Sequence, residues 1–156
     1  MGVGVRIAGS GMERFTLHLE SIINRIGDAE PAFKKIADVI RGMNKEQFAQ
    51  AGAYYGQRWE PLTPRYAAWK SVKRPGVPIM VFDGLLKESL TGAVMGVEET
   101  TNRSVTAGTQ VEYGRYHQDG VPQNNLPARP LLGDIPKFKV QEISSIIHRF
   151  IVEGDV

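Results

Sequence analysis

The sequence has no cysteine and only three histidines, and these shortages exclude several kinds of chemistry. Without cysteine, the 156-residue chain can form no disulfide, no thiol nucleophile and no thiolate site for zinc or an iron–sulfur cluster. The histidines fall in three separate predicted helices, and none is spaced with a second histidine or a carboxylate as metal motifs require. We therefore expect no metal, no cofactor and no catalytic residue.

One histidine keeps a catalytic hypothesis open. His117 lies close in sequence to Glu112 and Asp119, whereas His18 and His148 lie beside apolar stripes and are expected to be structural. A single histidine among acidic residues is a weak indication of a general base, because a catalytic site needs a convergent set of groups. An enzyme centred on His117 is therefore the third of our hypotheses.

Long hydrophobic runs are also absent. The longest uncharged apolar stretches, such as residues 76–82, are far shorter than the roughly 20 residues that a membrane-spanning helix needs. The N-terminal residues 1–11 contain no continuous apolar segment of the kind found in secretory signals. We expect a protein that is made in the cytoplasm and has no contact with a membrane.

The formal net charge of +2 conceals an asymmetry between the two halves of the chain. Residues 1–78 carry twelve basic and seven acidic side chains, whereas residues 79–156 carry seven basic and ten acidic ones. Oppositely charged surfaces suit head-to-tail self-association, although such a difference also arises by chance among solvated side chains. The small total argues against a surface devoted entirely to nucleic acid.

Hydrophobic periodicity and breaker residues predict a single α+β domain spanning residues 1–156. We expect a strand at residues 3–7, helices at 12–27, from 31 toward 55, at 65–72, 85–90 and 112–119 and from 136 onward, and a hairpin of strands at 93–100 and 104–110. The fold class is therefore a small, mainly antiparallel sheet packed against several helices, with a long ordered loop.

That loop, at about residues 57–82, contains both tryptophans of the chain and several prolines. Loops of this length are usually functional or disordered, and the aromatic content argues against disorder. A second irregular segment, at about residues 121–133, is rich in proline and asparagine and is expected to form an extended arm. Between them, Asp83 is placed to cap the helix that starts at Leu85.

Basic and aromatic side chains alternate within the long loop. The segment 58–74 contains Arg58, Trp59, Arg65, Tyr66, Trp69, Lys70, Lys73 and Arg74. Such a segment could neutralise phosphates and stack bases, as single-stranded nucleic-acid sites do. The alternative is that the aromatic rings anchor the loop to the core while the charges face water, and the low net charge favours this alternative. A nucleic-acid binding module using segment 58–74 is nevertheless our second hypothesis.

Four runs of sequence occur in a fixed order: WEPLTPRYAAWK at 59–70, FDGLLKESL at 82–90, VTAGTQVEYGRYHQDG at 105–120 and LPARPLLG at 126–133. Together they resemble the phage virion morphogenesis proteins, the tail completion proteins of tailed phages such as Mu and P2. Members commonly have Thr-Gly where this chain has Asp83-Gly84, and Ala where it has Gly114. The resemblance therefore leaves open whether the chain is a tail terminator, a tail completion protein or a head–tail connector.

The resemblance implies a structural protein of the virion neck that completes the tail or joins it to the head. It implies no enzymatic activity. The implied assembly is a ring, expected to be a hexamer, around the DNA channel. The implied partners are further copies of the chain, the tail tube or tail terminator, and the head connector or portal-side proteins, with non-specific contact to channel DNA. The implied location is the virion, and the host cytoplasm during assembly.

Trp, Tyr and Arg supply most interface hot spots, and they guide the choice of contact residues. The candidate interface residues are Arg58, Trp59, Tyr66, Trp69, Lys70, Arg74, Tyr113, Tyr116, His117 and Arg129. Arg129 lies between Pro127 and Pro130, where a stiff segment loses little entropy on docking. Its guanidinium could bind an acidic group of an adjacent subunit or one of its own chain, and the sequence does not decide between them.

Overall fold

The computed structural model of the protein describes residues 9–92 and 96–155, so the strand expected at residues 3–7 lies outside the described residues. The elements follow in the order α1 (Gly9–Gly27), α2 (Glu30–Ala49), η1 (Ala53–Tyr55), α3 (Pro64–Lys73), α4 (Leu85–Thr91), β1 (Val97–Thr100), β2 (Val105–Gly108), α5 (Tyr113–Asp119), η2 (Pro122–Asn124) and α6 (Lys137–Glu153). The predicted α+β fold class is confirmed. In the described part, no helix is long and apolar enough to cross a membrane.

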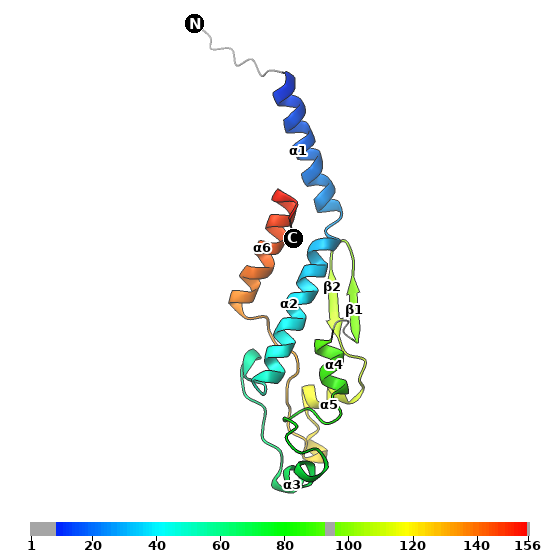
Figure 1. Cartoon of the computed structure of the whole chain (residues 1–156), viewed down its shortest axis with the longest axis vertical. Helices are drawn as coiled ribbons and strands as arrows, with labels where there is room; N and C mark the ends of the chain where they lie inside the picture. The colour runs from blue at the N-terminus through cyan, green and yellow to red at the C-terminus, as the bar shows by residue number, and fades with distance from the viewer. Residues whose placement is uncertain (1–8, 93–95, 156) are drawn as a thin grey trace.

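Helix α2 is the central helix of the molecule, and it packs between α6 on one side and the β-hairpin on the other (Figure 1). Pro31 lies in its first turn, where a missing N–H is harmless. Its apolar side chains recur at helical spacing and form one core cluster with α6, made of Ala29, Ala32, Ile36, Ile146 and Phe150. Burial of this stripe, rather than helix propensity, holds the two helices together.

The end of α2 differs from the prediction. The helix passes through Gly42 as expected, but it stops at Ala49 and does not continue toward Tyr55. Ala51 and Gly52 have φ angles of 50° and 95°, in the left-handed region that ends helices. At Gly52 a Cβ atom would lie 2.7 Å from the Trp59 backbone nitrogen, so this turn requires glycine.

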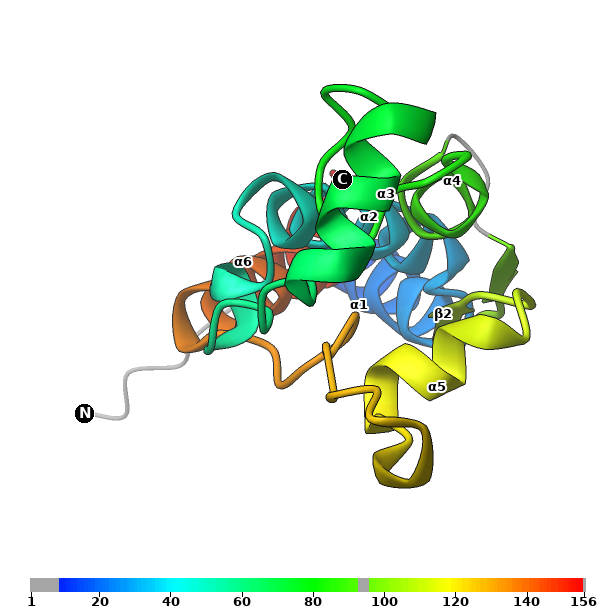
Figure 2. The same ribbon diagram turned by 90° about the horizontal axis from the view of Figure 1, so that it is seen from below.

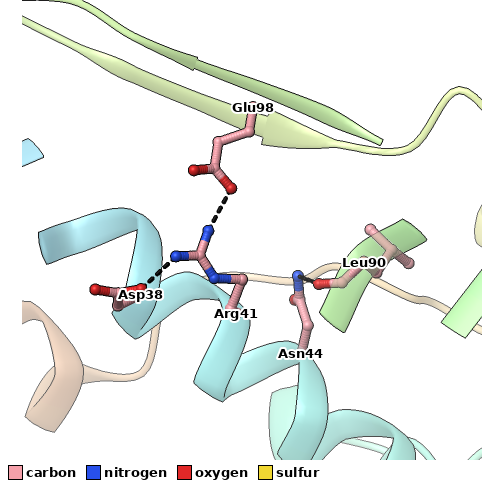
Figure 3. Close-up of polar contacts among 5 residues, drawn as sticks. All are labelled: Asp38, Arg41, Asn44, Leu90 and Glu98. Atoms are coloured by element: carbon pink, nitrogen blue, oxygen red, sulfur yellow. Dashed lines mark hydrogen bonds and ion pairs between the residues drawn. The ribbon is translucent and has the colours of Figure 1, made fainter. Parts of the chain in front are cut away.

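Strands β1 and β2 form the predicted antiparallel hairpin, with Val97 opposite Gly108 and Thr100 opposite Val105. The hairpin is fixed to α2 by polar contacts (Figure 3). Arg41 of α2 binds the carboxylate of Glu98 on β1 and that of Asp38 on its own helix.

A second polar contact joins α2 to α4. The Asn44 side chain is buried, and its Nδ2 donates to the Leu90 carbonyl at 3.0 Å (Figure 3). Asn44 Oδ1 accepts a hydrogen bond from the Tyr55 hydroxyl at 3.1 Å. The buried amide is therefore satisfied on both sides and sets the position of α4 along α2.

Helices α3 and α5 lie at the end of the molecule opposite α1, and Figure 2 views this end directly. Side chains cap the starts of α3 and α4. The Thr63 side chain accepts from the Tyr66 N–H at 3.4 Å at the start of α3. Asp83 Oδ1 accepts from the Leu85 N–H at 3.0 Å at the start of α4, as the sequence predicted.

The arm predicted at residues 121–133 is extended only in part. Residues 121–126 fold back on themselves, with Val121 bridged to Leu126, η2 between them and Asn125 at a φ of 52°. Asparagine tolerates this left-handed conformation because its short side chain bonds locally. Pro127 therefore begins the irregular stretch that leads to α6.

Candidate functional site

A cavity of about 680 Å³ is lined by residues of α3 and α5, at the end of the molecule opposite α1. Four segments of chain line it: residues 62–70, residues 80–86, α5 and residues 124–129. These segments are distant from one another in sequence. The cavity is therefore a product of tertiary packing.

Five of the ten candidate interface residues line this cavity. They are Tyr66, Lys70, Tyr113, His117 and Arg129. The sequence identified them as separate motifs in the long loop, in α5 and in the arm, and it gave no sign that they converge. The cavity also has lining residues that sequence reasoning missed, among them Met80, Asn125 and Leu126.

Lys70 is buried, with 5% of its surface exposed. Its ammonium group donates to the carbonyl of Pro78 across the loop that follows α3. Burial lowers the pKa of Lys70 below its usual value, because a low-dielectric surrounding disfavours the charged form. The structure thus places a poorly solvated cation in the wall of the cavity.

Arg129 is a second buried cation, 4% exposed. Its guanidinium donates to the carbonyls of Glu60 at 2.7 Å and Pro61 at 3.0 Å, and its backbone N–H donates to the His117 carbonyl at 2.6 Å. The alternative of a bond to an acidic group of its own chain is not met, since the guanidinium binds backbone carbonyls and not a carboxylate. Arg129 thus joins the long loop, which its side chain binds, to α5, which its backbone N–H binds.

His117 also lines the cavity. Its imidazole packs edge-on against the Tyr113 ring, with centroids 6.3 Å apart, and its Nδ1 atom is buried without a hydrogen-bond partner in the described structure. Burial, assisted by the positive charge of Arg129, lowers the pKa of His117 below its ordinary value of 6.5. The folded protein therefore favours the neutral imidazole.

This predicts a dependence of stability on pH. As the pH falls through about 6.5, the unfolded chain takes up a proton on His117 before the folded chain does, so the free energy of unfolding decreases. We expect His117→Gln to make this decrease smaller between pH 7.5 and pH 5.5, measured by urea denaturation at each pH. Equal slopes in the parent and the variant would contradict the assignment.

Beside the cavity, aromatic rings of the long loop stack on one another. The Trp69 ring is parallel to that of Phe82, with centroids 5.6 Å apart, and it also contacts Tyr66 at 5.3 Å. The guanidinium of Arg74 lies over the Phe82 ring at 5.1 Å. These partly exposed side chains therefore stack on one another in a row.

The other candidate residues are placed differently. Trp59 is only 3% exposed; its ring packs edge-on against Phe48 and its indole N–H donates to the Pro130 carbonyl at 2.7 Å. Trp59 is therefore a core residue, as the alternative interpretation of the loop proposed. Arg58 is exposed, and Tyr116 is exposed beside Arg115, outside the cavity.

A second surface was missed as a contact site by the sequence reasoning. Helix α1 forms as predicted, but it projects away from the rest of the molecule (Figure 1). Its apolar face is in solvent. This face, which we call the α1 stripe, consists of Met12 (47% exposed), Phe15 (57%), Leu19 (42%), Ile23 (65%) and Ile26 (56%).

Contact between α1 and the body is confined to the end of the helix. Arg25 donates to the carbonyls of Ile151 at 2.8 Å and Val152 at 3.1 Å, at the C-terminus of α6. Positive charge is favourable there because the last carbonyls of a helix carry partial negative charge. The α1 stripe itself has no covering layer in the described structure, which is unusual for a contiguous apolar surface.

The described residues, 9–92 and 96–155, contain no group of three or more His, Cys, Asp or Glu side chains that could hold a metal ion. The charged and titratable groups of the cavity include two buried cations, the imidazole of His117 and the Asp83 carboxylate, which caps α4. The arrangement is suited to holding an anionic or apolar group.

Comparison with known proteins places these features in context. The model of the phage virion morphogenesis family matches residues 11–151. The chain is 28% identical over 130 residues to the Mu-like prophage FluMu G protein 1 of Haemophilus influenzae, an alignment that covers 83% of this chain and 84% of that protein. No solved structure matches the chain.

Proposed function

Because this chain belongs to the phage virion morphogenesis family, we propose that it is a non-enzymatic structural protein of the virion neck. In this role it completes the tail or joins the tail to the head as an oligomeric ring around the DNA channel. Its similarity to a protein of a Mu-like prophage supports a place in the virion. The finer assignment depends on how the chain contacts other copies of itself.

The single observation that carries the proposal is the uncovered α1 stripe. A helix of 19 residues is about 28 Å long, and α1 is attached to the body only near its C-terminal end. An apolar face of this length is stable in water only when another surface covers it. Since residues 9–92 and 96–155, the part of the chain that the structure describes, leave the stripe open, the proposed covering surface is that of another molecule.

A second copy of the chain is the occupant that fits best. The stripe belongs to the basic half of the sequence, and the acidic half carries an exposed apolar surface at the start of α6. Ile135 is 45% exposed, Phe138 59% and Val140 48%. An arm that docks on a different surface of the next copy makes a heterologous contact, and such contacts close into a ring when the rotation permits.

In the proposed assembly the ring is a hexamer. Its outer faces contact the tail tube or tail terminator on one side and the head connector or portal-side proteins on the other. Exposed basic residues of the long loop, Arg65, Lys73 and Arg74, are available for non-specific contact with channel DNA.

The nucleic-acid binding module based on segment 58–74 is less well supported. Trp59 and Lys70 are buried, and Trp69 stacks on Tyr66 and Phe82. Binding through base stacking requires aromatic faces that are free to receive a base. The conformation of the loop therefore favours contact with protein.

Electron microscopy of phage particles tests the proposed location. A phage lacking this chain is expected to produce heads and tails that fail to join or to complete, and gold-labelled antibody is expected to mark the neck of normal particles. Restoring the chain from a plasmid should restore joined particles. Labelling of the capsid alone, or normal joining in its absence, would refute the proposal.

A further inference from the structure

The cavity at the α3 and α5 end has two cations in its wall and no carboxylate paired with either. Lys70 and Arg129 are 5% and 4% exposed, and neither takes part in an ion pair within the described structure. Their hydrogen bonds go to backbone carbonyls of Pro78, Glu60 and Pro61. Lysine and arginine are rarely buried to this degree without an anionic partner.

The missing partner has an energetic consequence. A carbonyl dipole compensates only part of the hydration that a buried ammonium or guanidinium loses. Burial lowers the pKa of both Lys70 and Arg129, at Arg129 against the opposing effect of the Glu60 carboxylate, which makes no ion pair with it. An anion entering the cavity would recover the lost interaction at both side chains, so the unliganded site favours binding of negative charge.

The remaining walls define what kind of molecule carries that charge. Most of the lining is apolar or uncharged, and it includes Leu62, Met80, Val81, Leu86, Leu126 and Pro127. The acidic residue in the wall is Asp83, whose carboxylate accepts the Leu85 N–H. The cavity thus combines recessed positive charge with an apolar surface of about the size that a few side chains fill.

We propose that this cavity is a docking socket for an acidic segment of a partner protein, in which a carboxylate pairs with Arg129 and Lys70. Apolar side chains on either side of that carboxylate fill the rest of the cavity. The proposal goes beyond self-assembly through the α1 stripe, because the socket lies at the opposite end of the molecule. Either interaction can fail without the other.

A protein carboxylate fits this geometry better than a nucleic-acid phosphate. Proteins that bind nucleic acid without sequence preference present cations along an exposed groove, where they follow a continuous backbone. Here the cations are recessed behind apolar walls, and a single side chain can reach them. Arg129 presents a planar guanidinium, which pairs with planar carboxylates in a defined geometry.

Calorimetric titration of the full-length protein tests the socket. The probe is a pentapeptide of alternating leucine and glutamate with blocked termini, and the control probe has glutamine in place of glutamate. We expect the glutamate peptide to bind at millimolar concentration or below and the glutamine peptide to bind at least tenfold more weakly, because a charge-assisted hydrogen bond is lost. Light scattering of the same samples reports the oligomeric state separately.

Two variants on α3 provide a matched pair. Lys70→Met removes the buried cation while keeping an unbranched side chain, and Lys73→Met removes an exposed cation one turn later. We expect Lys70→Met to weaken binding of the glutamate peptide at least tenfold and Lys73→Met to leave it unchanged. Urea denaturation should show that unbound Lys70→Met is at least as stable as the parent, since replacing an unpaired buried charge by an apolar side chain is favourable.

The other outcomes overturn the proposal. Equal binding of the two peptides, no binding of the glutamate peptide at millimolar concentration, or equal loss in Lys70→Met and Lys73→Met would exclude a carboxylate socket. A decamer of oligothymidylate serves as a competing probe. If it binds in a manner that requires Lys70 while the glutamate peptide does not, the cavity is a phosphate site and the proposal is wrong.

Discussion

Replacing Leu19 and Ile23 together by glutamate is expected to convert the assembled protein to monomers without loosening its fold. Both side chains lie in the α1 stripe, 42% and 65% exposed, so neither contributes to the core of its own chain. Two carboxylates placed in a docked apolar interface would be desolvated without partners, which costs several kcal/mol of interface free energy. We therefore expect the affinity between copies to fall by about a hundredfold or more. Light scattering measures the loss of assembly, and thermal unfolding measures the fold.

Leu17→Glu is the matched control for this experiment. Leu17 is 64% exposed on the same helix, but it lies about 200° around the helix from Leu19 and therefore outside the α1 stripe. We expect this variant to assemble as the parent does. Equal dissociation by Leu17→Glu, or intact assembly of the double variant, would show that the stripe is not the docking surface.

Trp59→Ala is expected to lower the free energy of unfolding by about 3–5 kcal/mol, the usual range for truncation of a buried aromatic residue. The Trp59 ring packs against Phe48, and its indole N–H binds the Pro130 carbonyl. Its loss would leave a cavity among Phe48, Leu86, Leu90 and Leu131, the apolar cluster around α4. Urea denaturation followed by circular dichroism gives the change.

Trp69→Ala provides the comparison within the same loop. Trp69 is 46% exposed and contributes mainly its stacking with Phe82 and Tyr66, so we expect a loss of about 0.5–1.5 kcal/mol. The two variants thus compare the stability contributed by the part of the loop that is anchored in the core, at Trp59, with that contributed by its exposed part, at Trp69. A larger effect at Trp69 than at Trp59 would contradict the packing described above.

Local signals in the sequence predicted most elements of the fold. The apolar spacing along 12–27 and 136–151 specified α1 and α6, and Asp83 and Pro31 marked helix starts that the structure confirms. Each of these signals acts within a few residues. The end of α2 was misjudged because it depends on Gly52 meeting the Trp59 backbone, a contact that only the folded chain creates.

The candidate site was predictable in composition but not in arrangement. Half of the ten candidate interface residues, chosen mainly because Arg and aromatic side chains are common in contact surfaces, line the cavity. The sequence could not show that Lys70 and Arg129 are both buried and line the same cavity, since they come from segments nearly 60 residues apart. Nor could it show whether the apolar face of α1 is covered by its own chain, because periodicity reports amphipathicity and not the identity of the covering surface.

The mass of the purified full-length protein in solution tests the central claim most directly. Sedimentation or native mass spectrometry over a range of protein concentrations is expected to show a closed oligomer of one defined size, six copies, that dissociates when the α1 stripe is charged. A protein that remains a monomer at every concentration would contradict self-association through α1. A stable dimer that grows no further would contradict the ring.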